Sequence, residues 1–441
     1  MASLKKRRRF FSPGALAGAQ GVRAGSLLLI VALGISGAST LLFQIIARRS
    51  LGADRWGSVA ILWSSTFLVS QVLWVSTTQT LARHISEREA RGEDWESVVH
   101  SVRRLGLFLL GSFVLLALLA NSLLSTGLFA GNAWLTVTLV FAVAGYAFNY
   151  FRRGVLTGHR QFARLSVLLI TESLARLVLT ATLLAVGSGV LGPAVAIAAA
   201  PILGALAVRA APTTASGRAS SPFHLGHAMG FALPVLVCMA CAQAMANGGP
   251  IVIGALGGAE SHIRAGLMLN ALTLTRMPQF VLSPAVNNLL PHLSRIAAVG
   301  DWRAFDRFTG RALGLIVLAG AGLVGGTWLL GEFAMRLAFG DDVAMSRGLL
   351  TVLALLAAFY LLNELLNQVL FACGLASLAA AGWVLGFFAT AGGVLFIKAE
   401  LLARVSYALT LGVMVTTLAL ASMHLLTSRR RPLSASTVPA P

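Results

Sequence analysis

Residues 84–106 read HISEREARGEDWESVVHSVRRLG, and a similar stretch, HLSRIAAVGDWRAFDRFTGRALG, occupies residues 292–314. Both copies keep a His, a Ser, a Gly, an Asp-Trp pair and a final Leu-Gly, and each lies between two long apolar segments. A second pair of motifs, Leu51-Gly52 with Gly57 and Leu256-Gly257 with Gly266, follows the first apolar segment of each half. The sequence therefore predicts a duplicated membrane protein with two similar halves, an organisation typical of transporters.

Composition places the chain in the membrane class. Of its 441 residues 57% are hydrophobic and only 11% are charged, and the mean hydropathy is +0.82, far from soluble averages. Apolar stretches of about 20 residues are long enough to cross the bilayer as helices. Twelve such stretches run over residues 27–47, 57–82, 105–125, 134–151, 165–187, 189–208, 228–247, 262–286, 311–331, 346–372, 377–397 and 404–426. Because they are continuously apolar rather than alternating, an all-α integral membrane protein is favoured over a β-barrel.

Between the halves, residues 209–226 are small, polar and interrupted by Pro212 and Pro222, a composition typical of a flexible connector. The predicted organisation is a basic tail, a six-helix bundle, this linker, a second pseudo-symmetric six-helix bundle and a disordered tail. These parts span residues 1–24, 25–208, 209–226, 227–428 and 429–441. The repeated loops at 83–104 and 287–310 carry Trp and other apolar residues at helical spacing among charges, which predicts two amphipathic helices on the membrane surface.

The orientation follows from the distribution of basic residues. If the N-terminus lies in the cytoplasm, most of the 34 Lys and Arg fall in the inside segments, as the positive-inside rule requires. The strong preference for Arg over Lys suggests a GC-rich bacterial genome. We therefore expect a multi-pass protein of the bacterial cytoplasmic membrane with both termini in the cytoplasm. The net charge of +19 is spread over short loops, so we expect membrane lipids and no nucleic acid as partners.

Charged residues inside the spans are the candidate functional groups, since a charge at a span centre costs about 2.5–3.5 kcal/mol and usually faces a bundle interior or an aqueous cavity. Glu172 and Arg176 lie four apart on one helix, where they could either form a structural ion pair or contact a substrate or coupling ion. Arg276 has no acid in its span, and the nearby Pro278 can break the helix. Glu364 could couple transport to H+ or Na+, or form interhelical hydrogen bonds.

Further polar residues lie at span ends. Arg48 and Arg49 end the first span, and Asn149 precedes Arg152-Arg153 at the end of the fourth. The arginines could anchor the protein at the interface, and Asn149 could line a polar passage. Arginines outnumber acids in the spans, which predicts a positive cavity for an anionic cargo, because guanidinium groups bind phosphate in a bidentate way. We expect no catalytic residue, no cofactor and no metal site, since the three Cys lie in or beside spans without nearby ligands.

Several short motifs resemble those of a known family. They are LGADRWG at 51–57, GVLTGHRQF at 154–162, Arg276-Met277-Pro278 and LPHLS at 290–294. In their order and spacing they resemble polysaccharide-export and O-antigen-type flippases of the multidrug/oligosaccharidyl-lipid/polysaccharide (MOP) exporter superfamily. The resemblance implies a V-shaped pair of bundles whose arginine-lined cavity accepts a lipid-linked sugar pyrophosphate. Arg276 matches a cavity arginine best, and Arg48 or Arg49 one near the outer gate. Twelve spans, rather than fourteen, distinguish this chain from many lipid II flippases.

The predicted function is therefore alternating-access translocation of a lipid-linked oligosaccharide or polysaccharide precursor, a polyprenyl-pyrophosphate sugar. Arg276, Arg48, Arg49, Arg176 and Asn149 are the candidate substrate-binding residues, and two glutamates, Glu172 and Glu364, are the candidates for ion coupling. One alternative is a multidrug or small-molecule exporter of the same superfamily, although the first span lacks a carboxylate for cationic drugs. A membrane-embedded glycosyltransferase or polymerase is a weaker alternative, because the outer loops are short; we therefore expect no enzyme activity.

Overall fold

The computed structural model describes residues 13–129, 131–209, 225–287, 289–340 and 345–429, and within them every regular element is a helix. The elements are α1 (Pro13–Arg91), α2 (Glu96–Leu119), the π-helical turn η2 (Leu123–Leu128), α3 (Ala133–Gly158), α4 (Phe162–Ala185), α5 (Leu191–Leu206), α6 (Leu225–Leu256), the 3-10 turn η3 (Gly258–Glu260), α7 (Ser261–Thr275), α8 (Met277–Asn287), α9 (Leu290–Val299), α10 (Trp302–Phe339), α11 (Arg347–Ala372), α12 (Ala376–Phe396) and α13 (Leu401–Arg429). The all-helical membrane fold is confirmed.

The twelve predicted apolar segments are all helical. Within the described residues, nine helices are by themselves long and apolar enough to cross a membrane. One of these, α1, supplies two of the twelve segments, because its 79 residues bend at Gly52, whose φ of 78° is accessible to glycine at little cost. The helix α5 is a shorter apolar helix, and the predicted span at 262–286 is divided into α7 and α8 by Arg276.

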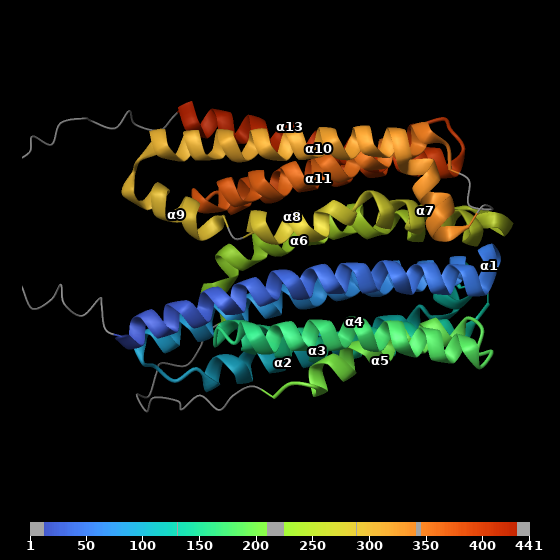
Figure 1. Cartoon of the computed structure of the whole chain (residues 1–441), viewed down its shortest axis with the longest axis horizontal. Coiled ribbons are helices and arrows are strands. Elements are labelled where there is room, and N and C mark those ends of the chain that lie inside the picture. The colour runs from blue at the N-terminus through green and yellow to red at the C-terminus, as the bar shows by residue number, and fades with distance from the viewer. Residues whose placement is uncertain (1–12, 130, 210–224, 288, 341–344, 430–441) are drawn as a thin grey trace, which may run out of the picture.

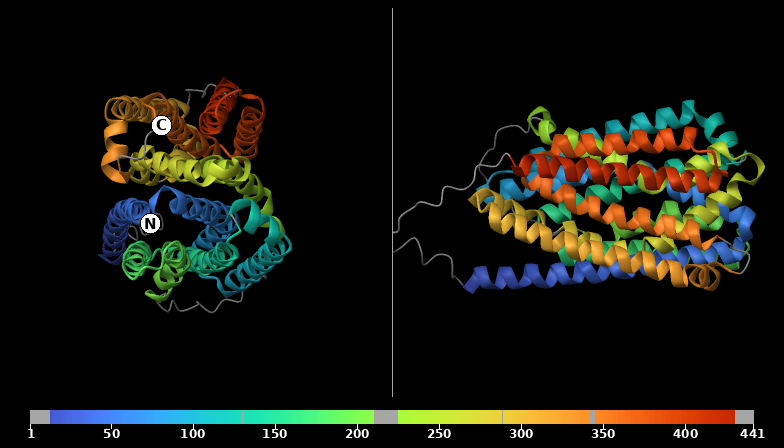
Figure 2. Two further views of the ribbon diagram at one scale, coloured as in Figure 1. Left: turned by 90° about the vertical axis from the view of Figure 1, so that its right-hand side faces the viewer. Right: turned by 90° about the horizontal axis from the view of Figure 1, so that it is seen from above.

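The two halves of the chain form two lobes, α1–α5 and α6–α13, which lie side by side (Figures 1 and 2). The described ends of the chain, in α1 and α13, lie at the same end of the molecule, on the left of Figure 1, which we call the terminal end. The opposite end, where α1 turns back at Gly52, is called the Gly52 end. The lobes meet mainly where α1 packs against α6 and α7.

The predicted surface helices differ between the two halves. In the first half residues 83–91 continue α1, which is stabilised there by the Arg83–Glu87 ion pair at 2.8 Å, one turn apart. The helix α2 then begins at Glu96, so the prediction of a separate helix at 83–104 is wrong. In the second half α9 is a short separate helix that ends at Gly300, in the left-handed conformation with φ 77°. Residues from Trp302 onward already belong to α10.

The predicted tails and linker fall largely outside the described residues, at 1–12, 210–224 and 430–441. The limits of the two bundles, 25–208 and 227–428, therefore stay a prediction.

Helix packing in the C-terminal lobe depends on close approach at small residues. A Cβ atom at Gly386 of α12 would lie 1.9 Å from the hydroxyl oxygen of Thr416, and one at Gly412 of α13 would lie 1.8 Å from that of Thr390. The two helices therefore contact each other through reciprocal glycine and threonine positions. Such contacts favour association in lipid, where the hydrophobic effect does not drive helices together.

Candidate functional site

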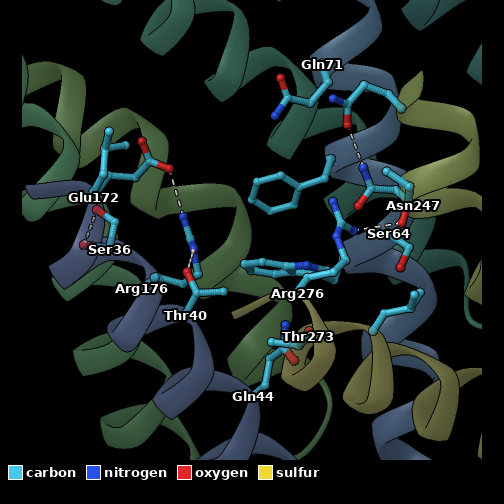
Figure 3. Close-up of a pocket in the computed structure, with 18 of the residues that line it drawn as sticks. Ser36, Thr40, Gln44, Ser64, Gln71, Glu172, Arg176, Asn247, Thr273 and Arg276 are labelled. Atoms are coloured by element: carbon cyan, nitrogen blue, oxygen red, sulfur yellow. Dashed lines mark hydrogen bonds and ion pairs between the residues drawn. The ribbon is translucent and has the colours of Figure 1, made fainter. Parts of the chain in front are cut away.

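A cavity of about 330 Å³ lies between the two lobes (Figure 3). Its wall is formed by α1, α3 and α4 of the first lobe and by α6, α7 and α11 of the second. Four of the predicted site residues line this cavity: Glu172, Arg176, Arg276 and Glu364. The Glu172–Arg176 pair, Arg276 and Glu364 lie far apart in the sequence, so the structure brings together charged groups that had been singled out only by their cost in lipid.

Glu172 is the centre of a buried cluster in the first lobe. Its carboxylate accepts hydrogen bonds from Arg176 at 2.8 Å and from Asn149 at 3.1 Å. It also accepts from Tyr146 at 3.2 Å and forms an ion pair with Arg153. Residues 146, 149 and 153 are spaced by three and four on α3, which places them on one helix face toward α4. Glu172 thus pairs with both arginines and offsets one of their two positive charges, so the cluster keeps a net charge of +1.

Aromatic rings support both arginines of this cluster. The guanidinium carbon of Arg176 lies 4.9 Å from the ring centre of Trp63 and 5.8 Å from that of Phe67. The guanidinium carbon of Arg153 lies 4.7 Å from the Tyr150 ring. Cation–π contacts of this kind hold a guanidinium group in place without using its N–H donors. The Nε–H groups of both arginines are buried, and they donate to no acceptor among the described residues.

Arg276 occupies a helix break in the second lobe. The helix α7 ends at Thr275, and α8 begins at Met277 with Pro278 in its first turn, as the sequence predicted. The Arg276 guanidinium donates to the carbonyl oxygen of Ala246 at 2.9 Å and to the side chain of Gln279 at 3.1 Å. In the part of the chain that the structure describes, no carboxylate lies within ion-pair distance of Arg276. Its charge therefore remains available to an anion in the cavity.

Glu364 lines the same cavity from α11. Its Oε2 atom is buried and has no hydrogen-bond partner among the described residues, although Ser283 lies in hydrogen-bonding contact with the carboxyl group. Neighbouring Tyr360 places its ring 5.8 Å from the guanidinium carbon of Arg276. The two carboxylates of the cavity therefore differ: Glu172 is held by two arginines, whereas Glu364 is ion-paired with no cation in the described structure.

Three predicted site residues lie outside the cavity wall. Asn149 is fully buried behind Glu172 and also donates to the carbonyl oxygen of Pro201 at 2.8 Å. Arg48 is buried and Arg49 is exposed. Arg49 donates to the carbonyl oxygen of Ala338 at 3.0 Å and to that of Leu337, at the last turn of α10. It thus joins the two lobes and satisfies carbonyl groups that a helix end leaves unpaired.

The lobes are in tight contact at the Gly52 end. The Trp56 indole donates to the side-chain oxygen of Asn270 at 3.0 Å, and both residues are fully buried. The Ser58 hydroxyl lies 3.3 Å from the imidazole of His262. The backbones approach so closely that a Cβ atom at Gly57 would lie 1.8 Å from the carbonyl oxygen of His262. These contacts hold the two lobes together at the Gly52 end.

Sequence reasoning missed part of the wall. Arg153 is paired with Glu172 and lines the cavity, whereas its place at a span end favoured an interfacial anchor. The uncharged polar residues of the wall were also missed, because Ser, Thr and Gln are common in spans and carry no distinctive signal. They are Ser36, Thr40, Gln44, Ser64, Gln71, Ser173, Gln243, Asn247 and Thr273.

Solved structures share this fold. An inward-facing multidrug resistance MATE family transporter of the MOP superfamily aligns with a TM-score of 0.71 and 15% identity, over 93% of this chain and 100% of that one. An outward-facing MATE family transporter aligns with a TM-score of 0.65 and 15% identity, over 92% of this chain and 95% of that one. The chain therefore has the two-lobed fold of MOP transporters.

Sequence relatives and a family model define the family. An uncharacterized protein of Mycobacterium tuberculosis (strain ATCC 25618 / H37Rv) is 25% identical over 417 residues, which cover 92% of this chain and 91% of the relative. A second uncharacterized protein of that strain is 26% identical over 350 residues, or 76% and 75% of the two chains. The model of the family described as "Polysaccharide biosynthesis protein" matches residues 22–297. This chain has the fold of MOP-superfamily transporters, and because the family model matches more than half of its sequence, it belongs to the polysaccharide biosynthesis protein family.

Proposed function

We propose that the protein is a flippase that moves a lipid-linked oligosaccharide or polysaccharide precursor, a polyprenyl-pyrophosphate sugar, across the bacterial cytoplasmic membrane. The observation that carries the proposal is the charge of the cavity. Its wall holds three arginines and two glutamates, and one of the glutamates is already bound by two of the arginines. The guanidinium of Arg276, which forms no ion pair with any described carboxylate, suits the pyrophosphate of such a lipid.

The proposed cycle begins with the cavity reached from the terminal end, which we assign to the cytoplasm. This assignment is supported by the concentration of arginines there and by the closed contact at the Gly52 end. The pyrophosphate binds Arg276, while Arg176 and Arg153 provide further positive charge from the opposite lobe. The polyprenyl tail stays in the bilayer. Separation of the lobes at the Gly52 end, where Arg49 joins α1 to α10, then releases the headgroup on the other side.

Glu364 is the proposed coupling group for H+ or Na+. It lines the cavity, and one of its carboxylate oxygens is buried without a partner in the part of the chain that the structure describes. Glu172 and Asn149 are assigned a positioning role instead. The four donors around Glu172 hold it in one place, and exchange of an ion there would leave two arginines unpaired.

Export of cationic drugs fits the cavity less well. A cation entering it would meet three arginines, whereas Glu364 is the one carboxylate of the wall that has no ion pair within the described residues. Bringing like charges together in a site of low dielectric constant costs free energy. The MATE fold of the structural neighbours is compatible with either cargo, so the charge of the wall favours the anionic one.

The test is translocation of a fluorescent undecaprenyl-diphosphate sugar in proteoliposomes, together with native mass spectrometry of the bound lipid. Arg276→Ala removes the unpaired charge, and losing charge-assisted hydrogen bonds worth about 1.5–3 kcal/mol weakens binding roughly 10- to 100-fold. Arg307→Ala is the matched control, because Arg307 is exposed in α10, away from the cavity wall. Equal binding and transport by wild type and Arg276→Ala would remove Arg276 from the mechanism.

A further inference from the structure

The helix α6 contains a proline, Pro250, one turn after Ala246, which lines the cavity. In an α-helix each carbonyl oxygen accepts a hydrogen bond from the N–H of the residue four positions later. Because proline has no N–H, the carbonyl group of Ala246 has no such partner within its own helix. In a membrane-spanning helix a carbonyl group freed in this way needs a donor from elsewhere in the protein, since lipid offers none.

Arg276 supplies this donor. Its Nη1 atom lies 2.9 Å from the carbonyl oxygen of Ala246, and Figure 3 shows Arg276 beside Asn247, the residue that follows Ala246 in α6. The hydrogen bond from the guanidinium group therefore takes the place of the backbone bond that Pro250 removes. Since the donor is charged, this bond is stronger than one between two neutral groups.

Two fixed acceptors determine the direction of the Arg276 guanidinium. Its Nε–H donates to the side-chain oxygen of Gln279 at 3.1 Å, and one N–H of Nη1 donates to Ala246. A guanidinium group is planar and carries five N–H donors in a rigid fork, so holding two of its nitrogen atoms also orients the third. The remaining donors, on Nη1 and Nη2, form no hydrogen bond with a described residue. They are therefore left for an anion, in a fixed orientation.

We propose that Pro250 is a positioning residue for the cargo: by removing the backbone donor to Ala246, it keeps a carbonyl oxygen free to hold Arg276 ready for the pyrophosphate. This inference rests on the proposed function and adds to it a residue that is not itself part of the cavity wall. With an N–H at position 250, the backbone would compete with Arg276 for the same oxygen atom. A guanidinium released in this way must be ordered again when the cargo binds, which lowers the affinity roughly 2- to 10-fold.

The experiment measures binding of undecaprenyl diphosphate to the purified full chain. The proteins are wild type, Pro250→Ala, Arg276→Ala and the double variant. Pro250→Ala is expected to weaken binding roughly 2- to 10-fold without lowering the melting temperature in detergent, because it restores a backbone hydrogen bond. In the Arg276→Ala background the same change is expected to have no effect on binding, since Pro250 acts through Arg276. The matched control is Pro234→Ala, at the other proline of α6 and outside the cavity wall, which should leave the affinity unchanged.

A second comparison isolates the backbone N–H. L-lactic acid, placed at position 250 by suppression of a stop codon, has the side chain of alanine but an ester oxygen in place of the N–H. This ester variant is expected to bind undecaprenyl diphosphate as wild type does, whereas Pro250→Ala does not.

Three results would overturn the positioning role and leave the flippase proposal standing. They are an unchanged affinity in Pro250→Ala, an equal loss in the ester variant, and a loss that persists in the Arg276→Ala background. The last two would mean that Pro250 acts through the shape of α6 rather than through Arg276. Failure of wild type to bind undecaprenyl diphosphate would overturn the flippase proposal, and the positioning role with it.

Discussion

Replacing Gly57 with alanine should force the two lobes apart at the Gly52 end. A Cβ atom at this position would lie 1.8 Å from the carbonyl oxygen of His262 and 2.2 Å from its carbonyl carbon. Both atoms belong to the backbone of α7, so no change of rotamer can relieve the clash. The helices α1 and α7 must separate by more than about 1 Å to reach an ordinary van der Waals distance.

The magnitude follows from the cost of overpacking a well-packed contact, about 1–3 kcal/mol. If this cost applies only when the lobes are closed at the Gly52 end, the ratio of closed to open molecules falls roughly 5- to 150-fold. The assay measures labelling of Ser58→Cys by a membrane-impermeant maleimide added from outside the cell, with the three native cysteines replaced by alanine. Ser58 contacts His262 across the same interface, so its accessibility reports the separation directly.

The matched control is Gly34→Ala, a change on the same helix at a position where a Cβ atom would meet nothing within 4 Å. Faster labelling is expected with Gly57→Ala and unchanged labelling with Gly34→Ala. Equal labelling of the two variants at equal expression would refute the proposal that the lobes separate at this contact during transport.

Three further predictions concern the cavity and the helix packing. Glu172→Gln leaves two buried arginines without a carboxylate and should lower the free energy of unfolding by about 3–5 kcal/mol, which thermal unfolding in detergent would detect; a melting temperature like that of wild type would contradict it. Glu364→Gln should keep that stability but make transport in proteoliposomes independent of an imposed proton or sodium gradient, and retained gradient dependence would exclude the coupling role. Gly412→Ala should destabilise α13 against α12 by about 1–3 kcal/mol, whereas Gly392→Ala, where a Cβ atom meets nothing within 4 Å, should not; equal effects would disprove the close-packing explanation.

The spans could be predicted because hydrophobic length is a local property of the sequence. The break at Arg276 was also predictable, since Pro278 removes a backbone donor and disfavours a continuous helix. The separate surface helix at 83–104 was predicted wrongly, because where that helix begins is not a local property of the sequence. Amphipathic spacing is the same whether a polar segment forms its own helix or continues a neighbouring one. Leu81 and Ile85, one turn apart, are both buried in one cluster with Val98, which favours continuation of α1.

The site was predictable only where its residues are costly in lipid. Glu172, Arg176, Arg276 and Glu364 stand out in apolar surroundings, and all four line the cavity. Arg153 did not stand out, because an arginine at a span end can extend to the interface. Its partner Glu172 is on another helix, and only the packing of α3 against α4 brings the two together. The same applies to Gln44 and Thr273, whose proximity depends on contact between different lobes.

The position of α7 links the cavity to the contact at the Gly52 end. His262 and Asn270 of this helix hold α1 there, and the helix ends one residue before Arg276 in the cavity. From His262 to Arg276 the distance along the axis is about 21 Å at 1.5 Å per residue. We expect an uninterrupted helix of this length to move as a unit, and the helix ends at Thr275, before α8 begins at Met277. We therefore propose that an anion bound at Arg276 shifts α7, and with it His262 and Asn270, so that binding in the cavity is coupled to opening at the Gly52 end.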